Sequence, residues 1–79
     1  MNHELKILPE YFEAVASGKK KFEIRKDDRN YQVGDLLILK EYKDGEYTGR
    51  VIRMGVSYIY RGSGEYGLQE GYCILSLFS

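Results

Sequence analysis

One short segment of the sequence carries side chains that could bind a phosphate group. Lys20, Glu23 and Arg25 lie within six consecutive residues, and Gly18 precedes them. A lysine attracts phosphate as a point charge, and an arginine can hold it through two parallel hydrogen bonds. The carboxylate of Glu23 could accept from a base amino group, or could fix one of the two cations. The alternative is a solvated strand face with a surface ion pair that contributes about 0 to 1 kcal/mol.

Positive charge is concentrated around this segment. Over the whole chain, 12 basic and 12 acidic side chains cancel, which excludes the overall positive field of a bulk nucleic-acid binder. Between residues 19 and 29, six basic side chains stand against three acidic ones, which leaves a local charge of +3. Arg29 ends this window, and we expect it to extend the anion site of Lys20 and Arg25.

A second candidate contact precedes a glycine-rich loop. Tyr60 lies beside Arg61 at the expected end of a strand, where its ring could stack on an exposed base. Most of the other tyrosines are expected to pack, because tyrosine is a good strand residue. Residues 62–67 spell G-x-G-x-x-G, but only twelve residues follow, too few for the helix of a dinucleotide-binding unit. No cofactor is therefore predicted.

Metal-binding and disulfide-forming residues are scarce. His3 is the sole histidine and Cys73 the sole cysteine, so the sequence predicts no metal site and no disulfide. His3 shares one side of its strand with Leu5 and Ile7, which favours a partly buried structural histidine over a catalytic base. A single thiol favours a reducing cytoplasm, and no stretch approaches the ~20 apolar residues of a membrane span.

Hydrophobic periodicity predicts one domain over residues 1–79, mainly β with one short helix (α+β). Alternating apolar residues indicate strands at 2–8, 21–25, 36–42, 47–61 and 73–78. Pro9 suits the first turn of a helix and Gly18 its end. Asp44-Gly45 predicts a two-residue hairpin turn, and Gly55 predicts a bend in the long fourth strand. About five strands with such a bend are typical of a small open barrel.

The alternation in the second strand also assigns its two faces. Phe22 and Ile24 are expected to pack against the core, while Glu23 and Arg25 point outward. Lys20 precedes the strand, so its side chain could converge with these two on the outward side. A chain of 79 residues has a thin core, and a shallow surface site is therefore expected.

The candidate segment also carries a family resemblance. Gly18, Lys20, Glu23 and Arg25 fill the four fixed positions of a G-x-K-x-x-E-x-R pattern, which resembles the signature of ASCH domains. Further likeness to a group of small bacterial and phage proteins of unassigned function within this family lies at His3–Ile7, Pro9, Tyr11–Phe12 and Val33–Asp35. The resemblance spans nearly the whole chain. It implies a PUA-like open β-barrel, a cleft beside the signature, and RNA binding linked to translation or RNA processing.

The same resemblance leaves three functions open. Some ASCH relatives are amidohydrolases that remove an acyl group from modified cytidine with a lysine and a threonine. Lys20 matches that lysine, but Glu23 stands where the threonine nucleophile would be. A Lys20 and Glu23 pair could instead activate water, so hydrolysis is the minority alternative. A protein-interaction module is the third. The expected partner is RNA or a nucleotide, bound by a chain assumed to be monomeric.

Overall fold

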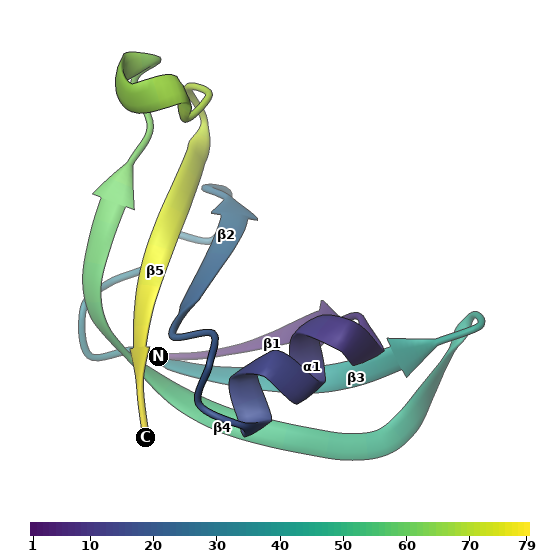
Figure 1. Ribbon diagram of the computed structural model, residues 1–79. Helices are drawn as coiled ribbons and strands as arrows, with labels where there is room; N and C mark the ends of the chain where they lie inside the picture. Colours follow the sequence, from purple (N-terminus) through teal and green to yellow (C-terminus); the bar gives the residue numbers. More distant parts are fainter.

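The computed structural model describes residues 1–79 and shows one curled five-stranded sheet with a single short α-helix (Figure 1). In chain order the elements are β1 (Asn2–Ile7), α1 (Pro9–Ala16), β2 (Phe22–Lys26), β3 (Leu36–Lys43), β4 (Glu46–Arg61), the 3₁₀ turn η1 (Glu65–Gly67) and β5 (Tyr72–Phe78). The predicted fold class, mainly β with one short helix, is confirmed. The sheet forms a half-barrel. No helix is both long and apolar enough to cross a bilayer.

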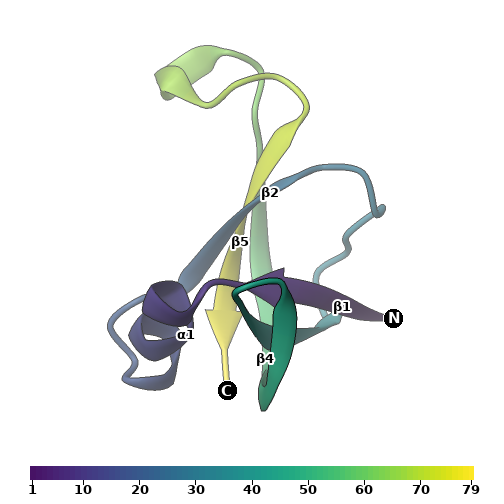
Figure 2. The ribbon, with the colours of Figure 1, turned by 90° about the vertical axis from the view of Figure 1, so that its right-hand side faces the viewer.

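The curl of the sheet brings its two edges together. The strand order is β1-β3-β4-β5-β2, so β1 and β2 are the edges. β1 pairs with β3 in parallel, and all other neighbours are antiparallel. In Figures 1 and 2, β5 and the end of β4 run across the direction of β1 and β3. Consequently Arg25 of β2 lies close enough to donate a hydrogen bond to the carbonyl of Lys6 in β1.

The curl originates in β4, where the bend lies at the predicted glycine. Gly55 pairs with Leu36 of β3 on one side and with Phe78 of β5 on the other. Directly after it, the register between β4 and β5 shifts between Val56 and Tyr58, as at a β-bulge. A Cβ atom at Gly55 would lie 2.5 Å from the Phe78 ring, so a larger residue here would have to displace that ring. The long strand can therefore belong to both halves of the sheet.

The end of α1 delivers the candidate segment to β2. Pro9 occupies the first turn of the helix, and Gly18, with φ of +79°, closes it in the left-handed conformation. The N–H of Gly18 donates to the carbonyl of Val15 at 3.0 Å, and that of Lys20 donates to Ala14 at 2.9 Å. These bonds satisfy the last helical carbonyls. They also fix Lys20 immediately before β2.

The inner side of the sheet carries the core, and four polar or charged residues are buried with it: His3, Glu23, Asp35 and Glu41. Leu37, Leu39 and Leu75 are fully buried. His3 is also buried, as predicted for a structural histidine, and its Nε2 lies 2.8 Å from Oδ2 of Asp35. The carboxylate of Asp35 also accepts from the backbone N–H of Gln32 at 2.9 Å. The pKa of Asp35 is lowered from 3.8 to about 2, mainly by the hydrogen bond from His3, although burial opposes the shift.

Acid should weaken the fold through Asp35. Because its folded pKa of about 2 lies below its ordinary 3.8, its contribution is fully present above pH 3.8 and is lost as the pH falls toward 2. A shift of this size corresponds to about 2 kcal/mol. Urea unfolding of the wild type and of Asp35→Asn at pH 6, 4 and 2 measures this contribution. Between pH 4 and pH 2, the free energy of unfolding should fall by about 2 kcal/mol less in the variant than in the wild type. Equal losses in the two proteins would contradict this role for Asp35.

Candidate functional site

β2 presents its charged side chains to the interior of the curled sheet, which reverses the predicted orientation. Glu23 is 4% exposed, whereas Phe22 and Ile24 are 42% and 52% exposed. The cause is the register with β5, in which Glu23 lies opposite the buried Leu75. Paired residues of neighbouring strands share a face, so Glu23 must point inward as well. The prediction that Phe22 and Ile24 face the core, with the charged side outward, is wrong.

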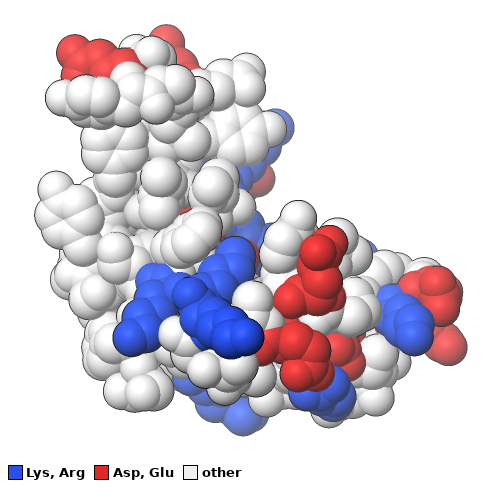
Figure 3. Space-filling model, in the orientation of Figure 1, with Lys and Arg blue, Asp and Glu red and all other residues white.

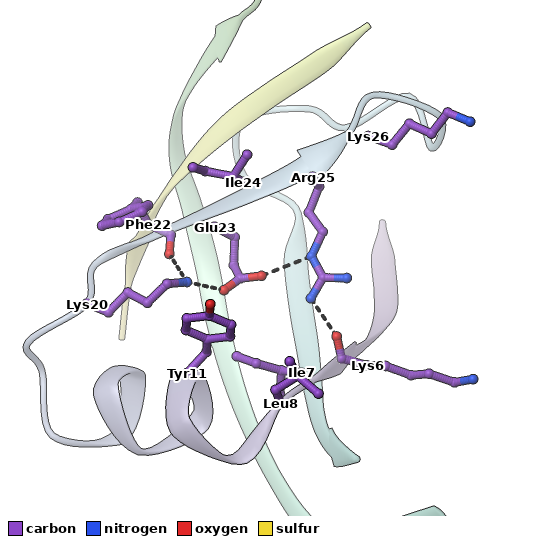
Figure 4. A pocket seen from close by; sticks show the side chains of 10 residues that line it. All are labelled: Lys6, Ile7, Leu8, Tyr11, Lys20, Phe22, Glu23, Ile24, Arg25 and Lys26. Carbon is purple, nitrogen blue, oxygen red and sulfur yellow. Dashed lines mark hydrogen bonds and ion pairs between the residues drawn. The ribbon is translucent and has the colours of Figure 1, made fainter. Parts of the chain in front are cut away.

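Two cations compensate the burial of Glu23 (Figure 4). Nζ of Lys20 donates to Oε1 of Glu23, and Nε of Arg25 donates to Oε2 at 2.9 Å. Nζ of Lys20 also donates to the carbonyl of Phe22 at 2.8 Å. A buried carboxylate is tolerated only when it is paired and hydrogen-bonded. The predicted convergence of Lys20, Glu23 and Arg25 is thus present, but on the inner side of the strand.

Arginine side chains bridge the gap between the two edge strands. Nη2 of Arg25 donates to the carbonyl of Lys6 at 2.6 Å, and Nη1 of Arg29 donates to the carbonyl of Glu4 at 2.8 Å. Glu4 and Lys6 are alternate residues of β1, so both carbonyls point to the same free edge. Guanidinium groups therefore take the place of a backbone ladder there. Arg29, which was predicted to extend the anion site, thus bonds to β1 and does not line the groove described below.

Lys20 and Arg25 retain hydrogen-bond donors that no protein atom uses. An ammonium carries three N–H groups and a guanidinium carries five. Lys20 uses two of its donors, on Glu23 and on the carbonyl of Phe22. Arg25 likewise uses two, on Glu23 and on the carbonyl of Lys6. One donor of Lys20 and three of Arg25 therefore remain for a bound anion, without any loss of the existing pairs.

A groove of about 490 Å³ opens beside these donors, a volume suited to a small ligand. Its side chains come from the end of β1, the start of α1, β2 and the residue Lys20 (Figure 4). The apolar ones are Ile7, Leu8, Tyr11, Phe22 and Ile24, and the charged ones are Lys6, Lys20, Glu23, Arg25 and Lys26. Four cations against one carboxylate leave a charge of +3 in the groove. The groove is therefore cationic and partly apolar.

Two exposed rings flank the ammonium of Lys20. Tyr11 of α1 is 45% exposed, and Phe22 of β2 is 42% exposed. Nζ of Lys20 lies 5.6 Å from the centre of the Tyr11 ring and 4.9 Å from that of Phe22. A cation over an aromatic face is attracted by the ring. The site thus places aromatic surface, on which a flat base can stack, next to donors for phosphate.

Tyr60 and Arg61 do not reach the groove. Arg61 donates to Oδ2 of Asp27 at 3.0 Å and to the carbonyl of Tyr31 at 2.7 Å, so its side chain holds the loop that follows β2. Tyr60 lies opposite Ile74 on the outer face of the sheet, and its ring centre is 6.3 Å from that of Tyr66. The structure therefore separates these two residues from Lys20, Glu23 and Arg25.

Sequence reasoning missed groove residues that come from β1 and α1. Tyr11 is adjacent to Phe12 on a short helix. Because Phe12 faces the core, the ring of Tyr11 had to be more exposed, and this could have been detected from the sequence. Lys6 and Leu8 gave no such signal, because they line the groove only when the curl brings β1 to β2. Their participation depends on tertiary structure alone.

The fold and the groove together define a small β half-barrel with a cationic groove on its surface. The chain belongs to the family described as "Domain of unknown function (DUF3850)", which matches residues 2–77. It is also similar to a protein of Escherichia phage P2 described as "Uncharacterized 12.9 kDa protein in GpA 3'region", with 47% identity over 55 residues. The aligned region covers 70% of this chain and 50% of the phage protein. The chain thus spans about half the length of that relative.

Proposed function

We propose that the groove binds RNA or a nucleotide, and that the chain is a PUA-like domain of the ASCH type. The observation that carries this proposal is the arrangement around Glu23. Its carboxylate lies between Lys20 and Arg25 and pairs with both, and these two cations, which keep unused donors, line a groove that also contains two exposed rings. The match of Gly18, Lys20, Glu23 and Arg25 to the ASCH signature supports the same assignment.

Each part of a nucleotide has a matching group in the groove. A phosphate accepts hydrogen bonds from the free donors of Arg25 and Lys20, and Lys6 and Lys26 add charge at the rim. The base stacks on Tyr11 or Phe22, whose rings are the exposed aromatic surface nearest these donors. Glu23 acts chiefly by holding the two cations in place. It also offers a spare lone pair to a base amino group.

The expected binding is local and sensitive to salt. The chain has no net charge, so attraction to RNA comes from the groove and not from an overall field. Phosphate contacts release counterions, and the affinity therefore falls as salt rises. From the ASCH resemblance we also propose a role in translation or RNA processing, and with it a location in the cytoplasm.

The binding site is tested by two alanine variants. We expect Lys20→Ala and Arg25→Ala each to weaken binding to single-stranded and structured RNA about 10-fold at ~50 mM salt. Each should also make the plot of log affinity against log salt shallower by about 0.7, because one phosphate contact is lost. Fluorescence anisotropy with labelled RNA measures both quantities.

Arg53→Ala is the matched control. Arg53 lies exposed on β4, outside the groove, so its loss removes the same charge without touching the site. Circular dichroism must show that all variants are folded. Unchanged affinity in Lys20→Ala and Arg25→Ala would refute the site. The alternative function is tested with a panel of N-acylated nucleosides. If the wild type released free nucleoside and Lys20→Ala did not, hydrolysis would replace RNA binding as the proposed function.

A further inference from the structure

The outer face of the upper half-sheet, formed by β2, β5 and the second part of β4, is nearly free of charge. Residues paired across neighbouring strands share a face, so the register defines its members. We call it the aromatic face, and its large members are Phe22, Ile24, Tyr58, Tyr60, Tyr72 and Ile74. Two cations lie at its margin: Lys26 at one corner, and Lys20, whose Nζ is 4.9 Å from the centre of the Phe22 ring. In Figure 3 the surface over β4 and β5 is almost entirely white.

The other half of the same sheet shows an ordinary solvated surface. Its outward residues include Glu4 and Lys40, whose charged groups lie 3.3 Å apart, and Lys6, whose Nζ lies 4.4 Å from the centre of the Tyr42 ring. Arg53 adds a further exposed charge. The absence of charge from the aromatic face is therefore specific to that half. It calls for a physical explanation.

The aromatic face is large enough for a protein interface. Tyr58 is 64% exposed, Ile24 52%, Phe22 42% and Tyr72 36%, and Tyr66, which continues the face beyond Tyr60, is 91% exposed. With about 200 Å² for each such side chain, these residues expose roughly 600 Å² of apolar-rich surface. The largest apolar patch of a monomer is typically about 300 to 600 Å². A standard interface buries about 800 Å² from each partner, so these side chains would supply most of one side of it.

We infer that the aromatic face docks against the same face of a second copy of this chain. A two-fold interface brings each patch against itself, so any charge near the axis meets a like charge. A face without charge avoids that repulsion, whereas it offers no cation to the phosphates of RNA. β5 lies at its centre, between β4 and the edge strand β2, and tyrosine side chains supply the aromatic surface that interfaces favour.

This dimer leaves the groove accessible. Glu23, Lys20 and Arg25 lie on the inner side of β2, whereas the aromatic face is the outer side of the same strand. Phe22, Ile24 and Lys26 border both surfaces, whereas Tyr11, the other ring of the groove, lies outside the aromatic face. Two grooves would then flank the interface, one from each copy.

Sedimentation equilibrium of the full chain between about 5 and 500 µM tests the inference. The mass of the wild type should rise toward twice 9.2 kDa with concentration. Tyr58→Glu and Tyr72→Glu each place a carboxylate in the aromatic face but outside the groove. We expect each to raise the dimer dissociation constant at least about 10-fold, as hot-spot aromatic losses do.

Val33→Glu is the matched control, because Val33 is 62% exposed in the loop before β3, away from the aromatic face. It should dimerise like the wild type, and circular dichroism should show all variants folded. A wild type that stays monomeric at every concentration would overturn the inference, even if it binds vesicles or another protein instead. A dimer that persists in both tyrosine variants would place the interface elsewhere and would overturn it equally.

Discussion

Glu23→Ala should lower the free energy of unfolding by about 2 to 4 kcal/mol. Removal of this carboxylate leaves the side chains of Lys20 and Arg25, which are only 17% and 24% exposed, beside each other without a counter-charge. Breaking a buried pair by removing one partner typically costs about 3 to 5 kcal/mol, and partial exposure of the cations reduces that figure. A domain of 79 residues has roughly 4 to 12 kcal/mol of stability in total. Urea unfolding at pH 7 measures the loss.

An exposed glutamate of the same chain provides the comparison for this variant. Glu13 forms an ion pair with Arg50 at 2.6 Å, but its side chain is 61% exposed. Glu13→Ala should therefore cost less than about 1 kcal/mol. If Glu23→Ala were no more destabilising than Glu13→Ala, Glu23 would not be the residue that organises the cluster.

Leu75→Ala should be similarly damaging, through loss of packing. Leu75 has 0% exposure at the centre of β5, directly opposite Glu23. Truncation of a fully buried leucine costs about 2 to 5 kcal/mol, because it removes apolar contacts and leaves a cavity. We expect a loss of about 3 to 4 kcal/mol in urea unfolding, with a population of unfolded chains detectable at 37 °C.

The neighbouring residue gives an internal control for Leu75→Ala. Ile74 is adjacent in sequence but lies on the outer face, where it is only partly buried. Ile74→Ala should cost about 1 kcal/mol when it is measured at low micromolar concentration. A cost for Ile74→Ala equal to that of Leu75→Ala would contradict the assignment of inner and outer faces.

Local signals predicted the elements of the fold well. Pro9 and Gly18 bracket α1, and Asp44 and Gly45 form the hairpin turn with φ of 52° and 84°. The bend at Gly55 was also predicted, because glycine within a long strand marks a bend or bulge, and the register shift lies directly after it. Each of these features depends on backbone preferences of one or two residues. The parallel pairing of β1 with β3 was not predicted, since it joins segments far apart in the chain.

The site was predicted in composition but not in orientation. Lys20, Glu23 and Arg25 do gather, because they are close in sequence and a carboxylate attracts both cations. Hydropathy assigned the outward face to Glu23, whereas the register with Leu75 decides its orientation and ion pairing makes the burial tolerable. Tyr60 and Arg61 lie elsewhere, since the path of β4 carries them away from the groove. The spacing of residues along the sequence of one strand does not give their distance from residues of another strand.

The guanidinium bridge between β1 and β2 has a mechanical consequence. A backbone ladder opens cooperatively, whereas Arg25 and Arg29 each hold β1 by a separate bond to one carbonyl. Either arginine can therefore lose its hydrogen bond to β1 while the rest of the sheet stays intact. An anion that uses only the free donors of Arg25 leaves its bond to Lys6 intact. A ligand that takes the donor now bonded to Lys6 would compete with that carbonyl, and the width of the gap would then depend on the occupancy of the groove.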